Sequence, residues 1–144
     1  MILKNIIKIY IIMGMSIILH ELGHWIVAKI FKFKNVKIVI GDKFYSINTK
    51  YFRFSPLIIS GYVEFNFTPN ITKKQIICFY LSGSFVNIVL IIMSLLFNKL
   101  FNEWIYLLIV NSLSVIFNLF PLKKLSNDFG NLYNDLIEIT TNYK

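Results

Sequence analysis

Residues 16–25 of the chain read SIILHELGHW and place two histidines and a glutamate inside a strongly apolar stretch. His20 and His24 are the two histidines of the whole chain. On a helix, residues four apart differ by about 40° in azimuth and about 6 Å in rise, so they share one face. Both imidazoles are therefore expected to reach one metal ion.

Glu21 completes the pattern. On a helix it projects about 100° away from His20, which lets it stand beside a metal without binding it. The motif His-Glu-x-x-His combines two imidazole ligands with a carboxylate that can accept a proton from an attacking water. HELGH, residues 20–24, matches every fixed position of this motif. Gly23 adds a small surface that another segment can approach closely.

The apolar surroundings of the motif weigh against a chance match, although five-residue patterns do arise by chance. An ionisable residue near the middle of a membrane-spanning helix costs about 2.5–3.5 kcal/mol on insertion scales, and such residues are as a rule functional. Three such residues within five positions are hard to explain without a structural or functional role. We therefore expect a metal site.

The composition favours a membrane protein with a single domain, residues 1–144. Hydrophobic residues make up 56% of the chain, above the roughly 45–50% of soluble domains. The net charge of +8 comes from basic residues that lie mostly between apolar stretches, where they set membrane orientation. No nucleic-acid-binding motif accompanies them, so no nucleic acid is expected as a partner. Cys78 is the one cysteine, which excludes an intramolecular disulfide and a cysteine-based zinc site.

Three stretches are long enough to cross a membrane, which takes roughly 20 apolar residues per helix. They are residues 6–31, 75–97 and 104–120, and Pro121 ends the last one. The first stretch differs from a secretory signal because it has no small-residue cleavage site and because it contains the histidines. We expect three transmembrane helices.

The segments outside these spans have other patterns. Over about residues 36–67, apolar or aromatic residues alternate with polar ones between Gly41 and Gly61, which predicts two to four short strands. After Pro121, a polar loop leads to a short amphipathic helix at about 132–140. The predicted fold is a mainly α membrane protein with three transmembrane helices, a small β-sheet between helices one and two, and a short C-terminal helix.

The distribution of charge predicts the orientation. Nine basic residues lie between Lys29 and Lys74, against two acidic ones, whereas the second connection carries only Lys99 and Glu103. The positive-inside rule then places the strand region and the carboxyl terminus in the cytoplasm, with the histidines near the cytoplasmic side. We expect an integral protein of a bacterial cell membrane.

The third metal ligand is expected to be a carboxylate. A catalytic zinc ion typically has three protein ligands and one open position, and the chain has no third histidine. Asp128 is the best candidate, because it lies in the loop after the Pro121 break and returns to the membrane edge of the histidines. Four other carboxylates are more simply interpreted as solvated surface charges: Asp42, Glu64, Asp135 and Glu138.

Four motifs, in this order along the chain, resemble those of the site-2 protease family of intramembrane zinc metalloproteases. HELGH is similar to the metal-binding helix of that family. SGYVEF (60–65) is similar to its Gly-Tyr-Val strand, and GSFVN (83–87) to its Gly-Pro-x-x-Asn motif. NLFP (118–121), followed by Asp128, resembles its Asn-x-x-Pro and Asp-Gly element. The chain departs from the family pattern at Ser84, which replaces the proline, and after Asp128, where a phenylalanine precedes the glycine.

The resemblance implies an enzyme that holds one Zn²⁺ ion and hydrolyses peptide bonds of membrane-embedded or membrane-adjacent substrates. It implies His20, His24 and Asp128 as zinc ligands and Glu21 as general base. It also implies five substrate-binding residues: Gly61, Tyr62, Val63, Asn87 and Asn118. SGYVEF is the preferred edge strand for pairing with an extended substrate.

Other interpretations remain open. A non-catalytic membrane metal-binding or substrate-binding protein of the same fold would keep the histidines but would not need Glu21. A tethered soluble protease would need a polar catalytic domain, for which three spans leave no room. Asn87 and Asn118 could serve as interhelical hydrogen-bonding residues. Substrate choice is expected to come from the core itself or from a regulatory membrane partner.

Overall fold

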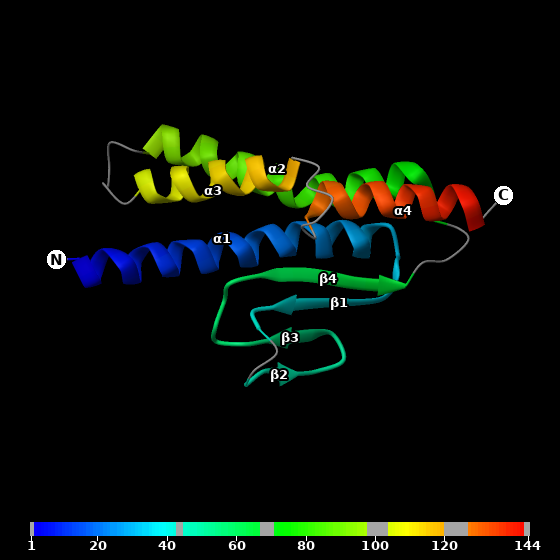
Figure 1. The fold of residues 1–144 in the computed structure, drawn as a ribbon, viewed down its shortest axis with the longest axis horizontal. Helices are drawn as coiled ribbons and strands as arrows, with labels where there is room; N and C mark the ends of the chain where they lie inside the picture. Colours follow the sequence, from blue (N-terminus) through cyan, green and yellow to red (C-terminus); the bar gives the residue numbers. More distant parts are fainter. Residues whose placement is uncertain (1, 43–44, 67–70, 98–103, 120–126, 143–144) are drawn as a thin grey trace.

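The computed structural model describes residues 2–42, 45–66, 71–97, 104–119 and 127–142, and it is mainly helical with one small sheet (Figure 1). The helices are α1 (Ile2–Ile30), α2 (Lys73–Phe97), α3 (Trp104–Leu119) and α4 (Asp128–Asn142). The strands are β1 (Lys34–Ile40), β2 (Ile47–Asn48), β3 (Phe52–Phe54) and β4 (Gly61–Asn66). The predicted order of helices and strands is confirmed.

Helices α1 and α2 are long and apolar enough to cross a membrane. Helix α3 is apolar but has 16 residues, which corresponds to about 24 Å against a hydrocarbon core of about 30 Å. Pro121 and both flanks of α3, residues 98–103 and 120–126, lie outside the described residues. The third predicted span is therefore not confirmed and stays a prediction.

The polarity of α1 is reversed relative to a helix of a soluble protein. Its apolar side chains point outward, and Ile6, Ile11 and Met15 are each more than half exposed. Its buried side chains include those of His20 and Glu21. Lipid suits an apolar exterior, while polar groups within a span face the bundle interior. This arrangement agrees with a membrane helix that carries a polar site on its inner face.

The sheet has the order β2-β3-β1-β4. Strand β1 pairs in parallel with β3 and antiparallel with β4, and β2 pairs antiparallel with β3. The sheet runs along the C-terminal half of α1, with β4 nearest to the helix (Figure 1). Since β4 pairs with β1 alone among the described strands, the prediction that SGYVEF forms an edge strand is confirmed.

Helix α4 begins earlier than the sequence predicted. The expected start near residue 132 is wrong, because Asp128 is already helical rather than part of a loop. The cause is an N-cap: the side-chain oxygen of Asn127 accepts a hydrogen bond from the backbone N–H of Gly130, at 2.9 Å. The Asn127 side chain also donates to the Phe117 carbonyl at the end of α3, at 2.7 Å. The cap thus fixes the first turn of α4, and Asp128 with it, against α3.

Candidate metal centre

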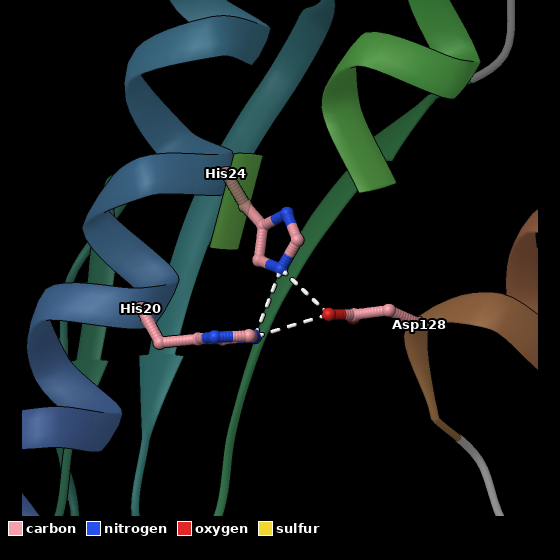
Figure 2. Close-up of side chains that lie close together, drawn as sticks. All are labelled: His20, His24 and Asp128. Carbon is pink, nitrogen blue, oxygen red and sulfur yellow. Dashed lines mark hydrogen bonds and ion pairs between the residues drawn. The ribbon is translucent and has the colours of Figure 1, made fainter. Parts of the chain in front are cut away.

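His20, His24 and Asp128 converge on one point between α1 and α4 (Figure 2). The Nε2 atoms of the two histidines lie 3.1 Å apart. Asp128 Oδ2 lies 3.1 Å from His20 Nε2 and 3.2 Å from His24 Nε2. Among the described residues this is the group of His, Cys, Asp and Glu side chains that could hold a metal ion.

The chemistry and the spacing of these three atoms fit zinc. Tetrahedral zinc lies about 2.0–2.1 Å from nitrogen and oxygen ligands, which places the ligand atoms about 3.3–3.4 Å from one another. The observed separations of 3.1–3.2 Å are only slightly shorter. Two imidazole nitrogens and one carboxylate oxygen are also the donor types that zinc takes at catalytic sites. The residues present therefore suit one zinc ion.

His24 is oriented by α2. Its Nδ1 lies 2.7 Å from the backbone carbonyl of Phe79 and 3.2 Å from the hydroxyl of Ser82. A carbonyl oxygen can only accept, so Nδ1 carries a hydrogen, which leaves Nε2 as the nitrogen that can offer a lone pair to a metal. A histidine ligand is commonly held in this way by a carbonyl on its other nitrogen. His24 thus has the tautomer that metal binding requires.

His20 is held by a different group of the same helix. Its Nδ1 lies 3.1 Å from Nδ2 of Asn87, which is buried at 1% exposure. Asn87 therefore contacts a metal-site histidine directly, and this contact was not anticipated from the sequence. The resemblance had implied a role in substrate positioning.

The pKa of Asp128 lies below its ordinary value. Burial acts to raise its pKa, but the hydrogen bonds and positive potential of His20 and His24 outweigh burial and lower the pKa to about 2. Its side chain is 19% exposed. The carboxylate is therefore in the charged form that binds metal.

A second carboxylate of α4, that of Asp135, forms a hydrogen bond with α2. The Tyr80 hydroxyl donates a hydrogen bond to Asp135 Oδ2, at 2.5 Å. Leu132, between the two carboxylates, is buried in a core cluster that also contains Ala28 and Phe79. The expectation that Asp135 is a solvated surface charge is wrong, because the amphipathic helix packs against α2 and brings Asp135 to Tyr80.

Two glycines allow backbone to approach the site closely. A side-chain carbon on Gly83 of α2 would collide with Nε2 of both His20 and His24. A side-chain carbon on Gly61 of β4 would lie 2.6 Å from Cγ of Glu21 and 3.1 Å from its Oε1. Gly83 therefore leaves room at the metal position, while Gly61 brings the edge strand against the candidate base.

A third glycine sets the distance between α1 and α2. A side-chain carbon on Gly23 would lie 2.8 Å from Val86 and 2.9 Å from the carbonyl oxygen of Ser82. The prediction that Gly23 permits close approach of another segment is confirmed, and that segment is α2.

A cavity of about 560 Å³ lies between the candidate metal ligands, Glu21 and strand β4. All nine residues that the sequence and the resemblance proposed for the site line it: His20, Glu21, His24, Gly61, Tyr62, Val63, Asn87, Asn118 and Asp128. The structure thus brings these nine residues together around one cavity. The alternative carboxylates behave differently: Glu64 is exposed on β4, Asp42 is outside the metal-capable group, and the side chain of Glu138 is not described.

The model of Peptidase family M50 matches residues 8–103, two thirds of the chain. The chain belongs to Peptidase family M50. This is the site-2 protease family, so the resemblance noted in the sequence is confirmed at the level of the family. Family membership indicates a membrane metalloprotease. No curated protein matches the chain.

The M50 match covers HELGH, SGYVEF and GSFVN but ends before Asp128. The third candidate ligand is thus supported by geometry, since its carboxylate meets both histidines in the folded chain. Within the matched part, α2 supplies none of the three candidate metal ligands. It nevertheless contacts both histidines through Phe79 and Asn87.

Three groups of the site were missed from sequence: the Phe79 carbonyl, the Ser82 hydroxyl and the Tyr80 hydroxyl. A backbone carbonyl has no sequence signature, because every residue has one. Ser82 and Tyr80 precede GSFVN by one and three positions. Tyr80 is seven residues, about two helical turns, before Asn87, so helical spacing could have placed it near the same face. Ser82 is five residues away and lies on another face, and the partners of both residues depend on how α1 and α4 pack on α2.

Proposed function

We propose that the chain is a zinc-dependent intramembrane endopeptidase that hydrolyses peptide bonds of membrane-embedded or membrane-adjacent substrates. The observation that carries this proposal is the convergence of His20, His24 and Asp128, with Glu21 beside them, on a cavity bordered by an edge strand. Membership of Peptidase family M50 supports the same conclusion.

The two histidines and Asp128 would hold the zinc ion. When bound there, zinc would polarise the scissile carbonyl and make a water molecule more acidic. Glu21 lines the same cavity and is buried at 6% exposure, so its carboxylate can take a proton from the attacking water and return it to the leaving amine. Two imidazoles, one ligand carboxylate and one base carboxylate are the parts that metal-assisted peptide hydrolysis requires.

Strand β4 gives the substrate a place to bind. Its outer edge borders the cavity at Gly61, Tyr62 and Val63. An extended peptide that adds to this edge would satisfy its own backbone groups and present its carbonyls to the site. A helical substrate hides those groups, so local unwinding must precede cleavage. Asn118 of α3 also lines the cavity and is proposed to bind the substrate or the developing oxyanion.

We also propose the orientation of the protein. Helices α1, α2 and α3 would span the membrane, and the carboxyl terminus would be cytoplasmic because the basic residues concentrate between α1 and α2. The site would then open toward the cytoplasm, which supplies water. The lipid bilayer, a membrane peptide and a regulatory membrane partner would be its interaction partners.

The test compares Glu21→Gln with wild type, in detergent, on a model membrane peptide. Removal of the base should lower cleavage by about 10²–10⁴-fold, while zinc per chain stays at the wild-type level because no ligand is lost. Asp42→Asn, which removes a carboxylate charge outside β4 and outside the metal-capable group, is the matched control and should cleave like wild type. Undiminished cleavage by Glu21→Gln would refute the mechanism.

A non-catalytic metal-binding protein is the second candidate. It would bind zinc in both wild type and Glu21→Gln and would cleave no peptide in either form. The burial of Glu21 against Gly61 disfavours this candidate. Burying a carboxylate costs free energy, and a protein that does not use Glu21 in catalysis would have no reason to bury it.

A further inference from the structure

A second cavity, of about 460 Å³, lies where the end of α1 meets the sheet. Three lysines line it, Lys29 of α1, Lys37 of β1 and Lys50 of the turn between β2 and β3, and we call it the basic pocket. Within the described residues, it shares no lining residue with the cavity of the metal centre. Its volume lies in the range of small-molecule sites, roughly 300–1,000 Å³. The basic pocket is therefore a separate candidate site.

Two of the three lysines gather at one aromatic ring. The Nζ atoms of Lys29 and Lys50 lie 5.7 and 5.4 Å from the centre of the Tyr51 ring. Lys29 Nζ also lies 5.4 Å from the centre of the Trp25 ring. The faces of aromatic rings attract cations at such distances, up to about 6 Å. Tyr51 thus brings together two positive groups from α1 and from the turn after β2, although these groups repel each other.

The third lysine adds to this positive charge. Lys37 Nζ donates a hydrogen bond to the neutral side chain of Asn48, at 2.7 Å. Glu64 of β4 lies opposite Lys37 in the sheet and lines the same pocket. Over the described residues, however, the structure contains no ion pair of Lys29, Lys37 or Lys50 with a carboxylate. Three ammonium groups against one carboxylate leave an excess of positive charge, which a bound anion would neutralise.

The backbone also shapes the basic pocket. The register of β1 against β4 shifts between Lys34 and Lys37, and Asn35 within this bulge has a positive φ of 55°. A bulge re-aims side chains and is often found next to functional sites. Asn35 and two buried apolar residues, Phe33 and Val36, line the pocket here. The pocket is therefore part of the folded structure and not only a gathering of surface lysines.

The basic pocket lies at the level where α1 would leave the membrane. Lys29 is in the last turn of α1, and Trp25 lies about one turn before it. The start of β1 and the turn between β2 and β3 lie toward this same end of α1 (Figure 1). Trp and Tyr gather at the headgroup level of membranes, and lysines at the ends of spans extend into it. Basic pockets at this level bind phosphate-bearing lipid headgroups.

We propose that the basic pocket binds a phosphate-bearing anion and that its source is the headgroup of an anionic lipid. Lysine is a common phosphate ligand because its ammonium group acts as a point charge on a flexible stem. The bound lipid would hold the sheet, and edge strand β4 with it, at the membrane surface. This inference rests on the membrane insertion of α1 in the proposed function but not on zinc or on proteolysis.

The test measures lipid binding to the purified protein in a neutral detergent by native mass spectrometry. Phosphatidylglycerol and phosphatidylcholine with the same acyl chains are titrated separately. Each lysine near an anionic headgroup gives about a fivefold gain in affinity. Wild type should therefore prefer phosphatidylglycerol, and Lys29→Gln/Lys50→Gln should bind it about 25-fold more weakly. Equal binding of both lipids by wild type, or wild-type affinity in the double variant, would overturn the proposal.

Lys73→Gln/Lys74→Gln is the matched control. It removes the same charge from two exposed lysines at the start of α2, outside the basic pocket. Its loss of affinity should stay below about fivefold, and a loss as large as that of the pocket variant would show general charge attraction and contradict a site. Lys29→Arg/Lys50→Arg keeps both charges and should bind the lipid like wild type. A full loss in this variant would contradict recognition by charge.

Glu64→Gln tests the sign of the charge that the pocket prefers. It removes a carboxylate that lines the pocket, so phosphatidylglycerol should bind more tightly than in wild type. Weaker binding in this variant would contradict a site for anions.

Free anions separate the two sources of phosphate. Inorganic phosphate and glycerol phosphate are added in large excess to the complex of wild type with phosphatidylglycerol. A lipid is held by its acyl chains as well as by its headgroup, so most of it should stay bound. Complete displacement would assign the pocket to a free phosphate and overturn the lipid source. Selective lipid binding by a protein that cleaves no peptide would instead refute the proposed protease activity and leave this inference standing.

Discussion

Helix α1 and helix α4 contribute to the same metal centre in different ways. In α1, His20 and His24 are one helical turn apart, so helix formation alone places both imidazoles on one face. In α4, Asp128 reaches them from more than a hundred residues away, and its position depends on the Asn127 cap and on the packing of Leu132. The local half of the site, His20 and His24, is therefore formed by one helix. The distal half, Asp128 on α4, is positioned by tertiary contacts.

Helix α2 connects the two halves without supplying one of the three candidate ligands. Phe79 and Asn87 contact the two histidines, Tyr80 binds Asp135 of α4, and Gly83 leaves space at the metal position. The three candidate ligands thus lie on α1 and α4, while α2 orients them. Substitutions around the site should therefore show separate effects on the histidines of the local half and on α4 of the distal half.

Gly83→Ala should have the largest effect on the local half. The added methyl group would occupy the space between the Nε2 atoms of both histidines, so zinc affinity should fall more than the roughly 100-fold upper range for loss of an orienting group. Cleavage should fall with it. Alanine is the better helix former by about 1 kcal/mol, so weaker helicity cannot be the cause. Zinc titration and circular dichroism together check this, and wild-type zinc binding by a folded Gly83→Ala protein would contradict the geometry.

Gly61→Ala should separate catalysis from metal binding. The methyl group would meet Glu21 at Cγ and displace its carboxylate, while the three candidate ligands stay in place. Cleavage should fall by up to the roughly 10²–10⁴-fold that a general base contributes, with zinc per chain unchanged. Peptide cleavage and zinc content are measured on the same preparation. Loss of zinc in this variant would mean that β4 supports the ligands and not only the base.

Tyr80→Phe should have the smallest effect, confined to the distal half. It removes the hydrogen bond from α2 to Asp135 but leaves Asp128 and both histidines unchanged. A hydrogen bond to a charged group contributes about 1.5–3 kcal/mol, part of which should appear as a few-fold to tenfold loss of zinc affinity. Hydrogen exchange should show faster opening of α4. Asp135→Asn retains an acceptor for Tyr80 and should be milder, and equal losses in both variants would argue against this contact.

The sequence predicted the local half of the site well, for a physical reason. The positions of His20, Glu21 and His24 follow from helical geometry, and the chain offered enough apolar length to expect a helix there. The alternating pattern over about residues 36–67 predicted the short strands. These features depend on neighbours in the chain, so they can be inferred before the fold is known.

The distal half was predicted less well. Asp128 was expected in a loop, although Asn127 is a favoured N-cap residue and could have indicated the helix start. Asp135 was expected in solvent, because nothing in a single sequence shows that Tyr80 lies opposite it. The orientation of Asn87 toward His20 likewise depends on the packing of α1 against α2. The number of spans and the orientation in the membrane stay predictions.

The most direct test of the account is zinc-edge X-ray absorption on the purified, zinc-loaded protein. Wild type should show a site of nitrogen and oxygen ligands at about 2.0–2.1 Å, with scattering from two imidazoles and no sulfur. Asp128→Asn, which retains both histidines, should bind zinc far more weakly and with an altered spectrum, while Glu21→Gln should reproduce the wild-type spectrum. A wild-type spectrum in Asp128→Asn, or sulfur in the zinc shell, would contradict the site formed by His20, His24 and Asp128.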